Sequence, residues 1–377
     1  MIRNAILCAV AALISLGASA PASAQDSRVR AAQSEDFARF APRSDTISTL
    51  LDFSYWDKAL HWFVLRMGRS LREYEPAPDK LTGSHMTFGH DSRYRLEGNR
   101  VAFSVMTDDV RRELTEYRKE LEQLPDTVPL TRLSRNEQLA YWINLHNAAV
   151  IEQIALAYPL STPARLRVGD MPLDESKFIT VAGVHMSPRD IRTRIVYPNW
   201  HDPKVIYGFW HGDIGGPSIS REAYDGTNVG QLLDEVAQEF VGSLRGTQRS
   251  GDTLLVSRLY LEARPFYFPD WPRDLRAHLL KYSNPEVTDL ITATQAVDAA
   301  IEETDIADLS KGEREPNYTE LVINGIQPGI GVDGAVARLL RERQEKLEEI
   351  YRRDGPRGQV IVGQGQGEVP KEPEVVR

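Results

Sequence analysis

Cysteine is almost absent from this chain of 377 residues, and the single one, Cys8, lies in an apolar stretch at residues 5–20. Arg3 precedes this stretch and Ala22-Ser23-Ala24 follows it, which is the pattern of a secretory signal peptide with its cleavage site. We therefore expect a signal peptide at residues 1–24 and a mature chain without cysteine. Such a chain has no disulfide framework, no thiolate zinc site and no cysteine nucleophile.

The sequence also lacks a second long apolar run. The stretch at 5–20 is shorter than the roughly 20 residues that cross a bilayer, and no later stretch of that length is free of charge. A retained N-terminal membrane helix is the less favoured alternative, and a lipoprotein is disfavoured because Cys8 lies inside the apolar run. The prediction is a soluble periplasmic or secreted protein with no transmembrane anchor after cleavage.

Basic residues are fewer than acidic ones, 45 Lys and Arg against 54 Asp and Glu. This balance argues against a protein that follows nucleic-acid phosphates or binds anionic membranes generally. The hydrophobic content of 41% with 26% charged residues is ordinary for a globular protein. We expect no nucleic-acid partner, and an unknown envelope component or a small ligand as the bound molecule.

Two helices follow from the spacing of apolar residues. Residues 108–124 carry apolar side chains at offsets of three and four. Residues 134–158 begin with Ser134 and Glu137, the capping-box pattern, and end before Pro159.

The C-terminal part contains a third helix and a tail. The helix at 333–353 is strongly charged, with one apolar stripe that could pack on the domain or on a partner, and docking on the domain is the favoured alternative. The tail at 354–377 is rich in Gly, Gln and Pro, and is expected to be disordered.

The helix at 134–158 is apolar nearly all round, which predicts burial in the middle of a domain. Asn144 and Asn147 share one of its faces and His146 points to another. Such buried polar groups either hold neighbouring loops by hydrogen bonds or line a ligand site, and the structural role is favoured. We expect the two amides to bond to the backbone of connecting segments, including the loop at 212–217.

After this helix the sequence changes to short β-like pieces and further helices. The predicted strands are 177–181, 204–210 and 253–261, and the predicted helices are 187–197 and 228–244. Helices outnumber strands and do not alternate with them, so we predict an α+β fold: a helix-rich single main domain with a small, mostly antiparallel sheet around the buried central helix. The predicted organisation is a signal peptide at 1–24, an N-terminal helical and loop segment at 25–106, a core at 107–275, C-terminal helices at 276–353 and a tail at 354–377.

Three segments carry a resemblance to a known family: Tyr141-Trp-Ile-Asn-Leu-His-Asn-Ala148, Val181-Ala-Gly-Val-His-Met-Ser-Pro-Arg-Asp-Ile191 and Gly215-Gly-Pro-Ser-Ile219. Their order and spacing resemble the family called domain of unknown function 547 over roughly residues 113–269. The resemblance rests mainly on the Trp-Ile-Asn-x-x-Asn helix. It implies a fold and a domain, and it brings no settled activity.

The chain departs from this family at positions that carry chemistry. Many members have Cys-x-x-x-x-Cys-Pro where this chain has residues 211–217, so that His211 and Gly216 stand at the cysteine positions. Arg192 and Thr193 stand where a Glu-His pair commonly follows the preceding Asp-Ile. The resemblance therefore implies a non-catalytic relative, or a member with rebuilt chemistry.

The segment at 211–220, which we call the glycine loop, is the best local candidate for a site. Gly212, Gly215 and Gly216 allow positive φ and a close approach of backbone N–H groups to a ligand. The spacing is neither that of a phosphate-binding P-loop nor that of a dinucleotide fingerprint. A structural turn is the favoured alternative.

The same segment holds the residue types of a hydroxyl nucleophile and its base, and the catalytic candidates are His211, Asp213 and Ser218. Ser218 follows a proline, however, and lacks the Gly-x-Ser-x-Gly elbow of many hydrolases. His85 and His90 could meet other histidines in space, but no His-x-x-x-His or His-Glu-x-x-His pattern supports a metal site. We expect no metal and no cofactor.

The segment at 264–272 is dense in aromatic residues and proline. It could offer a stacking surface to a sugar or peptide, and the favoured alternative is a loop whose aromatic side chains close the core.

Two functions remain open at this point. The first is a periplasmic binding or scaffold protein, in which Asn144, His146, Asn147 and the glycine loop shape a recognition surface. The second is a periplasmic hydrolase that uses His211 with a hydroxyl or water nucleophile. The missing cysteine favours the first, and the arrangement of these side chains around an open cleft would favour the second.

Overall fold

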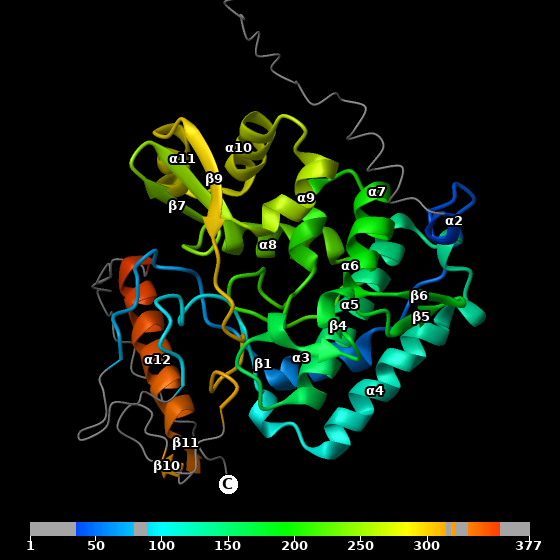
Figure 1. Cartoon of the computed structure of the whole chain (residues 1–377), viewed down its shortest axis with the longest axis horizontal. Helices are drawn as coiled ribbons and strands as arrows, with labels where there is room; N and C mark the ends of the chain where they lie inside the picture. Colours follow the sequence, from blue (N-terminus) through cyan, green and yellow to red (C-terminus); the bar gives the residue numbers. More distant parts are fainter. Residues whose placement is uncertain (1–34, 79–88, 314–317, 321–330, 355–377) are drawn as a thin grey trace, which may run out of the picture.

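The structure is a computed structural model that describes residues 35–78, 89–313, 318–320 and 331–354 (Figure 1). The predicted signal peptide and the tail at 355–377 lie outside the described residues. The chain is helix-rich, 51% helix and 11% strand, which confirms the predicted α+β class. Within the described part of the chain, no helix is both long enough and apolar enough to span a bilayer.

The centre of the fold is α5 (Arg135–Ala157), as predicted from its apolar circumference. Buried side chains lie on all its faces, and its N-cap is Ser134, whose Oγ accepts from the N–H of Glu137 at 3.2 Å. The predicted capping box is only half present, because the carboxylate of Glu137 accepts from the N–H of Leu51 at 3.3 Å. That contact ties the start of α5 to the chain entering α3 (Ser54–Phe63).

Helices from both sides of the sequence cover α5. On one side lies α4 (Asp108–Gln123), where the hydroxyl of Tyr141 donates to the carbonyl of Leu121 at 2.8 Å. On another lies α8 (Val229–Val241), at the position predicted for residues 228–244. The remaining α-helices described are α2 (Glu35–Ala38), α6 (Pro188–Asp190), α7 (Tyr197–Asn199), α9 (Leu259–Tyr267), α10 (Trp271–Tyr282), α11 (Pro285–Thr292) and α12 (Gly334–Asp354).

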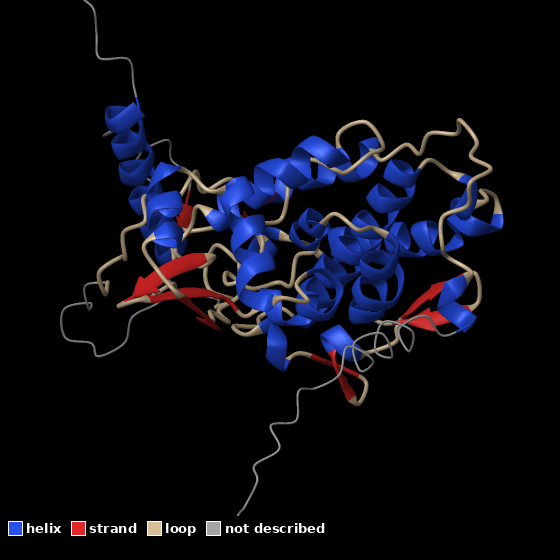
Figure 2. Ribbon diagram, turned by 90° about the horizontal axis from the view of Figure 1, so that it is seen from above, coloured by secondary structure: helices blue, strands red, loops and turns tan. Residues whose placement is uncertain are grey.

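The described strands are short and lie at the periphery of the helical centre (Figure 2). They form five separate small sheets in place of the one expected, and all pairings except β8 with β9 are antiparallel. The two-stranded sheets are β1 (Val64–Leu65) with β2 (Arg100–Val101), β3 (Arg167–Val168) with β4 (Met171–Pro172), β5 (Ile179–Val181) with β6 (Val184–Met186), and β10 (Tyr318–Glu320) with β11 (Gly331–Asp333). The three-stranded sheet has the order β7 (Thr247–Ser250), β8 (Thr253–Ser257), β9 (Ala296–Ile301).

The predicted strand at 204–210 is wrong. The segment forms a 3₁₀ helix, Pro203–Gly208, which begins at Asp202 with its carboxylate accepting from the N–H of Lys204 at 3.1 Å. A cap followed by proline at the first helical position outweighs the β-branched and aromatic residues that suggested a strand.

Two further boundaries were misplaced. The strand predicted at 253–261 ends at Ser257, whose Oγ accepts from the N–H of Leu259, the first residue of α9. The aromatic segment at 264–272 is a loop only at residues 268–270, which link the end of α9 to the start of α10. Its role in closing the core is confirmed, since Phe268 is 1% exposed and its ring contacts those of Tyr260 and His278.

The helix predicted at 187–197 is longer than expected and not regular. It consists of α6, a π-helical turn at Ile191–Val196 and α7, and it continues through Pro198 to Asn199. Proline lacks an N–H to donate, and the widened turn directly before it departs from the regular α-helical pairing.

The C-terminal helix α12 docks on the N-terminal segment of the same chain, which confirms the favoured alternative. Leu339 packs on Met67 and Leu96, and the buried ammonium of Lys346 donates to the carbonyl of Leu96 at 2.6 Å. Glu342 forms an ion pair with Arg95 at 2.7 Å.

Candidate functional site

A buried polar cluster surrounds the guanidinium of Arg192, in the π-helical turn that follows α6. The guanidinium is fully buried and lies between two carboxylates. Its Nη1 and Nη2 donate to Asp174 at 2.7 and 2.8 Å, and its Nε and Nη2 donate to Glu262 at 2.8 and 2.9 Å. Nη1 also bonds to Nε2 of His146 at 2.9 Å. All five N–H groups of the guanidinium are therefore used. We call these four residues the Arg192 cluster.

The cluster is assembled from four elements. Asp174 comes from a 3₁₀ turn (Leu173–Glu175), His146 from α5 and Glu262 from α9. Burial alone would lower the pKa of Arg192, but the two carboxylates outweigh it and hold that pKa well above its ordinary value. The guanidinium is thus a permanent charge, neutralised in place.

His146 is held as a neutral ring. Burial, together with the nearby Arg192, sets its pKa well below the ordinary value. Because Nε2 accepts from Arg192, the proton is on Nδ1, which donates to Oδ1 of Asn147 at 3.0 Å. Both ring nitrogens are occupied, so His146 has no free nitrogen for a ligand or a proton transfer.

His211 faces this cluster from the glycine loop, with its ring centroid 6.4 Å from that of His146. Its Nε2 is buried and has no hydrogen-bond partner among the described residues. Burial and the charge of Arg192 lower the pKa of His211 to about 4, so the ring is neutral at pH 7. A polar atom in this position can bond to a water molecule or to a polar group of a ligand.

The other two catalytic candidates make no hydrogen bond to His211. The hydroxyl of Ser218 donates to Glu239 at 2.9 Å and accepts from the N–H of Asn99 at 3.1 Å and from Arg245 at 3.0 Å. It lines a cleft of about 190 Å³ with Asn99 and Glu239. A nucleophilic serine needs its base within hydrogen-bond reach, and here the hydroxyl is engaged elsewhere.

Asp213 is bound within its own loop, where its Oδ1 accepts from the N–H of Gly216 at 2.8 Å. Burial raises the pKa of Asp213 to about 7, with a further contribution from the carboxylate of Glu303. A carboxyl that is half protonated near neutral pH makes the stability of the fold depend on pH.

We predict that Asp213→Asn stabilises the protein at pH 8 but not at pH 4. The folded pKa of about 7 lies above the unfolded value of about 3.9, so the contribution of Asp213 is fully present below pH 4 and is lost as pH rises to 7. Asparagine keeps the acceptor for Gly216 and cannot ionise. The expected gain at pH 8 is between about 1 and 4 kcal/mol, measured by urea unfolding of both proteins across this range. Equal differences at pH 4 and pH 8 would contradict it.

At two positions, the backbone of the glycine loop packs closely against other parts of the chain. Gly212 has φ of +94°, and a Cβ there would lie 2.5 Å from Cδ1 of Ile154. A Cβ on Gly215 would lie 2.3 Å from the carbonyl oxygen of Glu303. At Gly216 the nearest atoms belong to Asp213 and His211. Protein atoms thus occupy the space beside Gly212 and Gly215, and Gly216 faces the two titratable side chains.

Asn144 and Asn147 are buried and bonded to the backbone of connecting segments, as predicted. Asn144 donates to the carbonyl of Tyr224 at 2.7 Å and accepts from its N–H at 3.2 Å. Asn147 donates to the carbonyl of Gly208 at 2.9 Å and accepts from the N–H of Trp210 at 3.0 Å. The expectation that these partners include the loop at 212–217 is wrong, because the bonds go to the segments just before and after it.

Replacing Asn147 with leucine is expected to destabilise the fold by about 1 to 3 kcal/mol, since the N–H of Trp210 and the carbonyl of Gly208 lose their partner. Asn144→Leu should cost a comparable amount through Tyr224. Asn136→Leu is the matched control, because Asn136 is exposed on the same helix and should change stability by less than about 0.5 kcal/mol. Thermal melts of the three variants test this. Unchanged melting temperatures of the first two variants would show that the hydrogen bonds of these amides do not stabilise the fold.

The structure describes only some of the histidines considered for a metal. His90 is buried, and its Nε2 bonds to the carbonyl of Asp308 at 2.6 Å, whereas His85 lies outside the described residues. In the part of the chain that the structure describes, no group of three or more His, Cys, Asp or Glu side chains is placed to hold a metal ion.

Sequence reasoning missed two members of the Arg192 cluster, Asp174 and Glu262. They lie 18 and 70 residues from Arg192 in the chain. The available signal was Arg192 itself, which stands where the family that the chain resembles commonly has a glutamate.

The comparisons with known proteins identify one domain. Residues 130–241 match the family described as "Protein of unknown function, DUF547". The chain thus carries this domain, over a shorter range than the 113–269 of the resemblance, and Glu262 lies outside it. The chain matches no curated protein and no solved structure.

Proposed function

We propose that this protein is an exported binding protein of the cell envelope that acts without covalent chemistry. The observation that carries the proposal is that the polar side chains considered for catalysis near the glycine loop already form hydrogen bonds within the fold. Every N–H of Arg192, both nitrogens of His146 and the hydroxyl of Ser218 have partners within the fold. The imidazole of His211, whose Nε2 has no partner among the described residues, can bond to a polar group of a ligand.

Export is part of the same proposal. It rests on the sequence at residues 1–24, with its basic start, apolar run and Ala-x-Ala site. The ligand is an envelope component or a small molecule, and the loop around His211 is the surface that contacts it.

One observation favours a second candidate function, a periplasmic hydrolase. The pKa of His211 is lowered to about 4 and that of Asp213 is raised to about 7, and a Cβ on Gly216 would lie 3.3 Å from Oδ1 of Asp213 and 3.7 Å from Cβ of His211. Two titratable groups whose pKa values are moved apart are typical of acid–base pairs. With Ser218 engaged, the nucleophile in this alternative is water.

The two functions are separated by mixing the mature protein with the insoluble envelope fraction of its source. A binding protein sediments with the fraction and releases no soluble fragments, and His211→Ala changes only the amount that sediments. Release of fragments by the parent protein that is lost in His211→Ala would overturn the proposal in favour of the hydrolase.

Export is tested by the intact mass of protein recovered from the periplasm. The expected N-terminus is Gln25, and treatment with an alkylating reagent should add no mass at cysteine, because Cys8 is removed. Recovery of the uncleaved chain in membranes would overturn this part of the proposal.

A further inference from the structure

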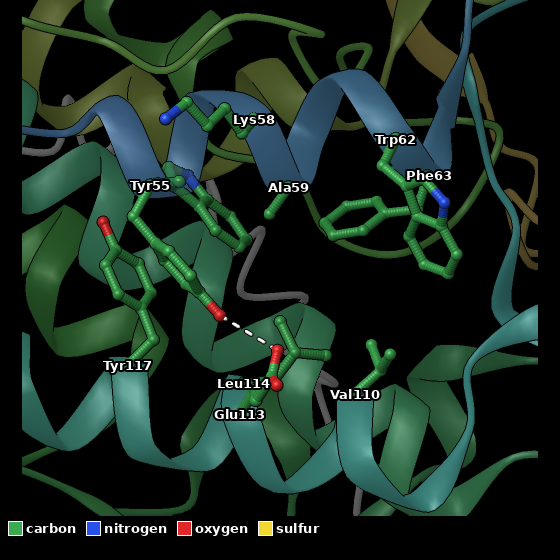
Figure 3. A pocket seen from close by; sticks show the side chains of 10 residues that line it. Tyr55, Lys58, Ala59, Trp62, Phe63, Val110, Glu113, Leu114 and Tyr117 are labelled. Carbon is green, nitrogen blue, oxygen red and sulfur yellow. Dashed lines mark hydrogen bonds between the residues drawn. The ribbon is translucent and has the colours of Figure 1, made fainter.

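A groove between α3 and α4 has no residue of the glycine loop in its lining and encloses a cavity of about 290 Å³ (Figure 3). Tyr55, Trp62 and Phe63 line it from α3, and Val110, Glu113 and Leu114 line it from α4. We call it the α3–α4 groove. A volume of this size accommodates a small ligand.

Two large aromatic side chains of the groove remain in contact with solvent. Trp62 is 59% exposed and Tyr55 is 51% exposed, although the residues that follow them on α3, Phe63 and Trp56, are buried. Exposed aromatic surface that borders a cavity is typical of a binding site. The small side chain of Ala59, between them on α3, leaves the groove open (Figure 3).

Glu113 and Lys58 are the two charged residues that line the groove. Glu113 lies at its wall and accepts from the hydroxyl of Tyr55 at 3.1 Å. Burial raises the pKa of Tyr55, and the carboxylates of Glu113, Glu120 and Glu116 raise it further. The ammonium of Lys58 points away from α4 (Figure 3).

The two arginines in the first turns of α4 form ion pairs with aspartates of the same helix. Arg111 is paired with Asp108 at 2.8 Å and Arg112 with Asp109 at 2.6 Å. An aromatic wall beside unneutralised carboxylates attracts a cation with an apolar body, because the face of an aromatic ring is negative.

We propose that the α3–α4 groove binds a small organic cation, an alkylated ammonium compound, between the rings of Trp62 and Tyr55 and the carboxylate of Glu113. The ligand is a free cation and not a lipid headgroup, since the three carboxylates repel the phosphate that accompanies such a group. The groove lies outside residues 130–241 and uses none of the Arg192 cluster, so this proposal is independent of the function proposed above.

The test compares choline with 3,3-dimethylbutan-1-ol, its neutral isostere of the same shape, by calorimetric titration of the mature protein at low salt. Choline is expected to bind more tightly than the isostere by roughly 2- to 30-fold, the range of a cation–π contact. Equal binding of the two compounds, or no binding of choline, would overturn the proposal.

Variants assign the binding to this groove. Trp62→Ala and Glu113→Gln, both at exposed positions, should each weaken choline binding by roughly 2- to 30-fold. Tyr351→Ala and Glu348→Gln on α12 are the matched controls and should leave it unchanged. Unchanged affinity in the first pair would overturn the assignment.

A last arm tests the source of the cation. Vesicles of phosphatidylcholine should not bind the protein through the groove. Vesicle binding that is lost in Glu113→Gln, without binding of free choline, would overturn the choice of a free cation.

Discussion

Replacing Arg192 with methionine is expected to lower the free energy of unfolding by roughly 3 kcal/mol, because it strips a buried cluster of its only cation. Glu262 is 19% exposed and would keep only its longer ion pair with Arg189 at 3.6 Å, and His146 would lose the donor to its Nε2. Asp174 is 45% exposed, so water replaces part of what it loses. Urea unfolding at pH 7 measures the effect.

The control for this prediction is Arg189→Met. Arg189 is 50% exposed and pairs with Glu175 at 2.8 Å and with Glu262 at 3.6 Å, so its loss should cost less than about 1 kcal/mol. In the double variant Arg192→Met/Glu262→Gln, part of the loss should be recovered, since the carboxylate that loses the two hydrogen bonds from Arg192 is no longer present. Equal stability of the Arg189 and Arg192 variants would show that the cluster does not hold the fold.

Asp308→Ala is expected to destabilise the protein by about 3 to 5 kcal/mol. Asp308 is fully buried and accepts from the N–H of Phe103 at 3.1 Å, from the hydroxyl of Tyr158 at 3.1 Å and from the N–H of Gly312 at 2.9 Å. These donors come from three distant parts of the chain, and alanine leaves all of them without this acceptor. Denaturant unfolding again gives the measurement.

Asp298→Ala is the matched control for Asp308→Ala. Asp298 stands on β9 and is exposed, so its removal should change stability by less than about 0.5 kcal/mol. A loss at 308 no larger than the loss at 298 would contradict the role given to Asp308.

The sequence predicted those elements whose signals are local. The starts of α4 and α5 follow from Thr107 and Ser134, side chains that accept hydrogen bonds at the helix N-terminus. The burial of Asn144 and Asn147 follows from the apolar residues around them. The strand predicted at 204–210 failed because β propensity depends on a partner strand, whereas the cap at Asp202 acts within its own turn.

The candidate site was less predictable, because its members are brought together by the fold. His211 and His146 were named from the sequence and do lie near each other. Their surroundings depend on Asp174 and Glu262, whose places in the sequence show no pattern that links them to Arg192. Ser218 was grouped with His211 because the two are close in the sequence. In the structure, the hydroxyl of Ser218 donates instead to Glu239 of α8.

The docking of α12 on the N-terminal segment also determines the order in which the chain can fold. The hydrogen bonds of Arg95 with Glu342 and of Leu96 with Lys346 join residues that are 247 and 250 positions apart in the sequence. Contacts this distant in sequence form late, after the loop between them has been closed at an entropic cost. During synthesis, residues such as Met67, Arg95 and Leu96 therefore remain without their final packing until α12 has been made. Truncation before α12 would leave Met67 and Leu96 exposed at the surface of an otherwise complete core.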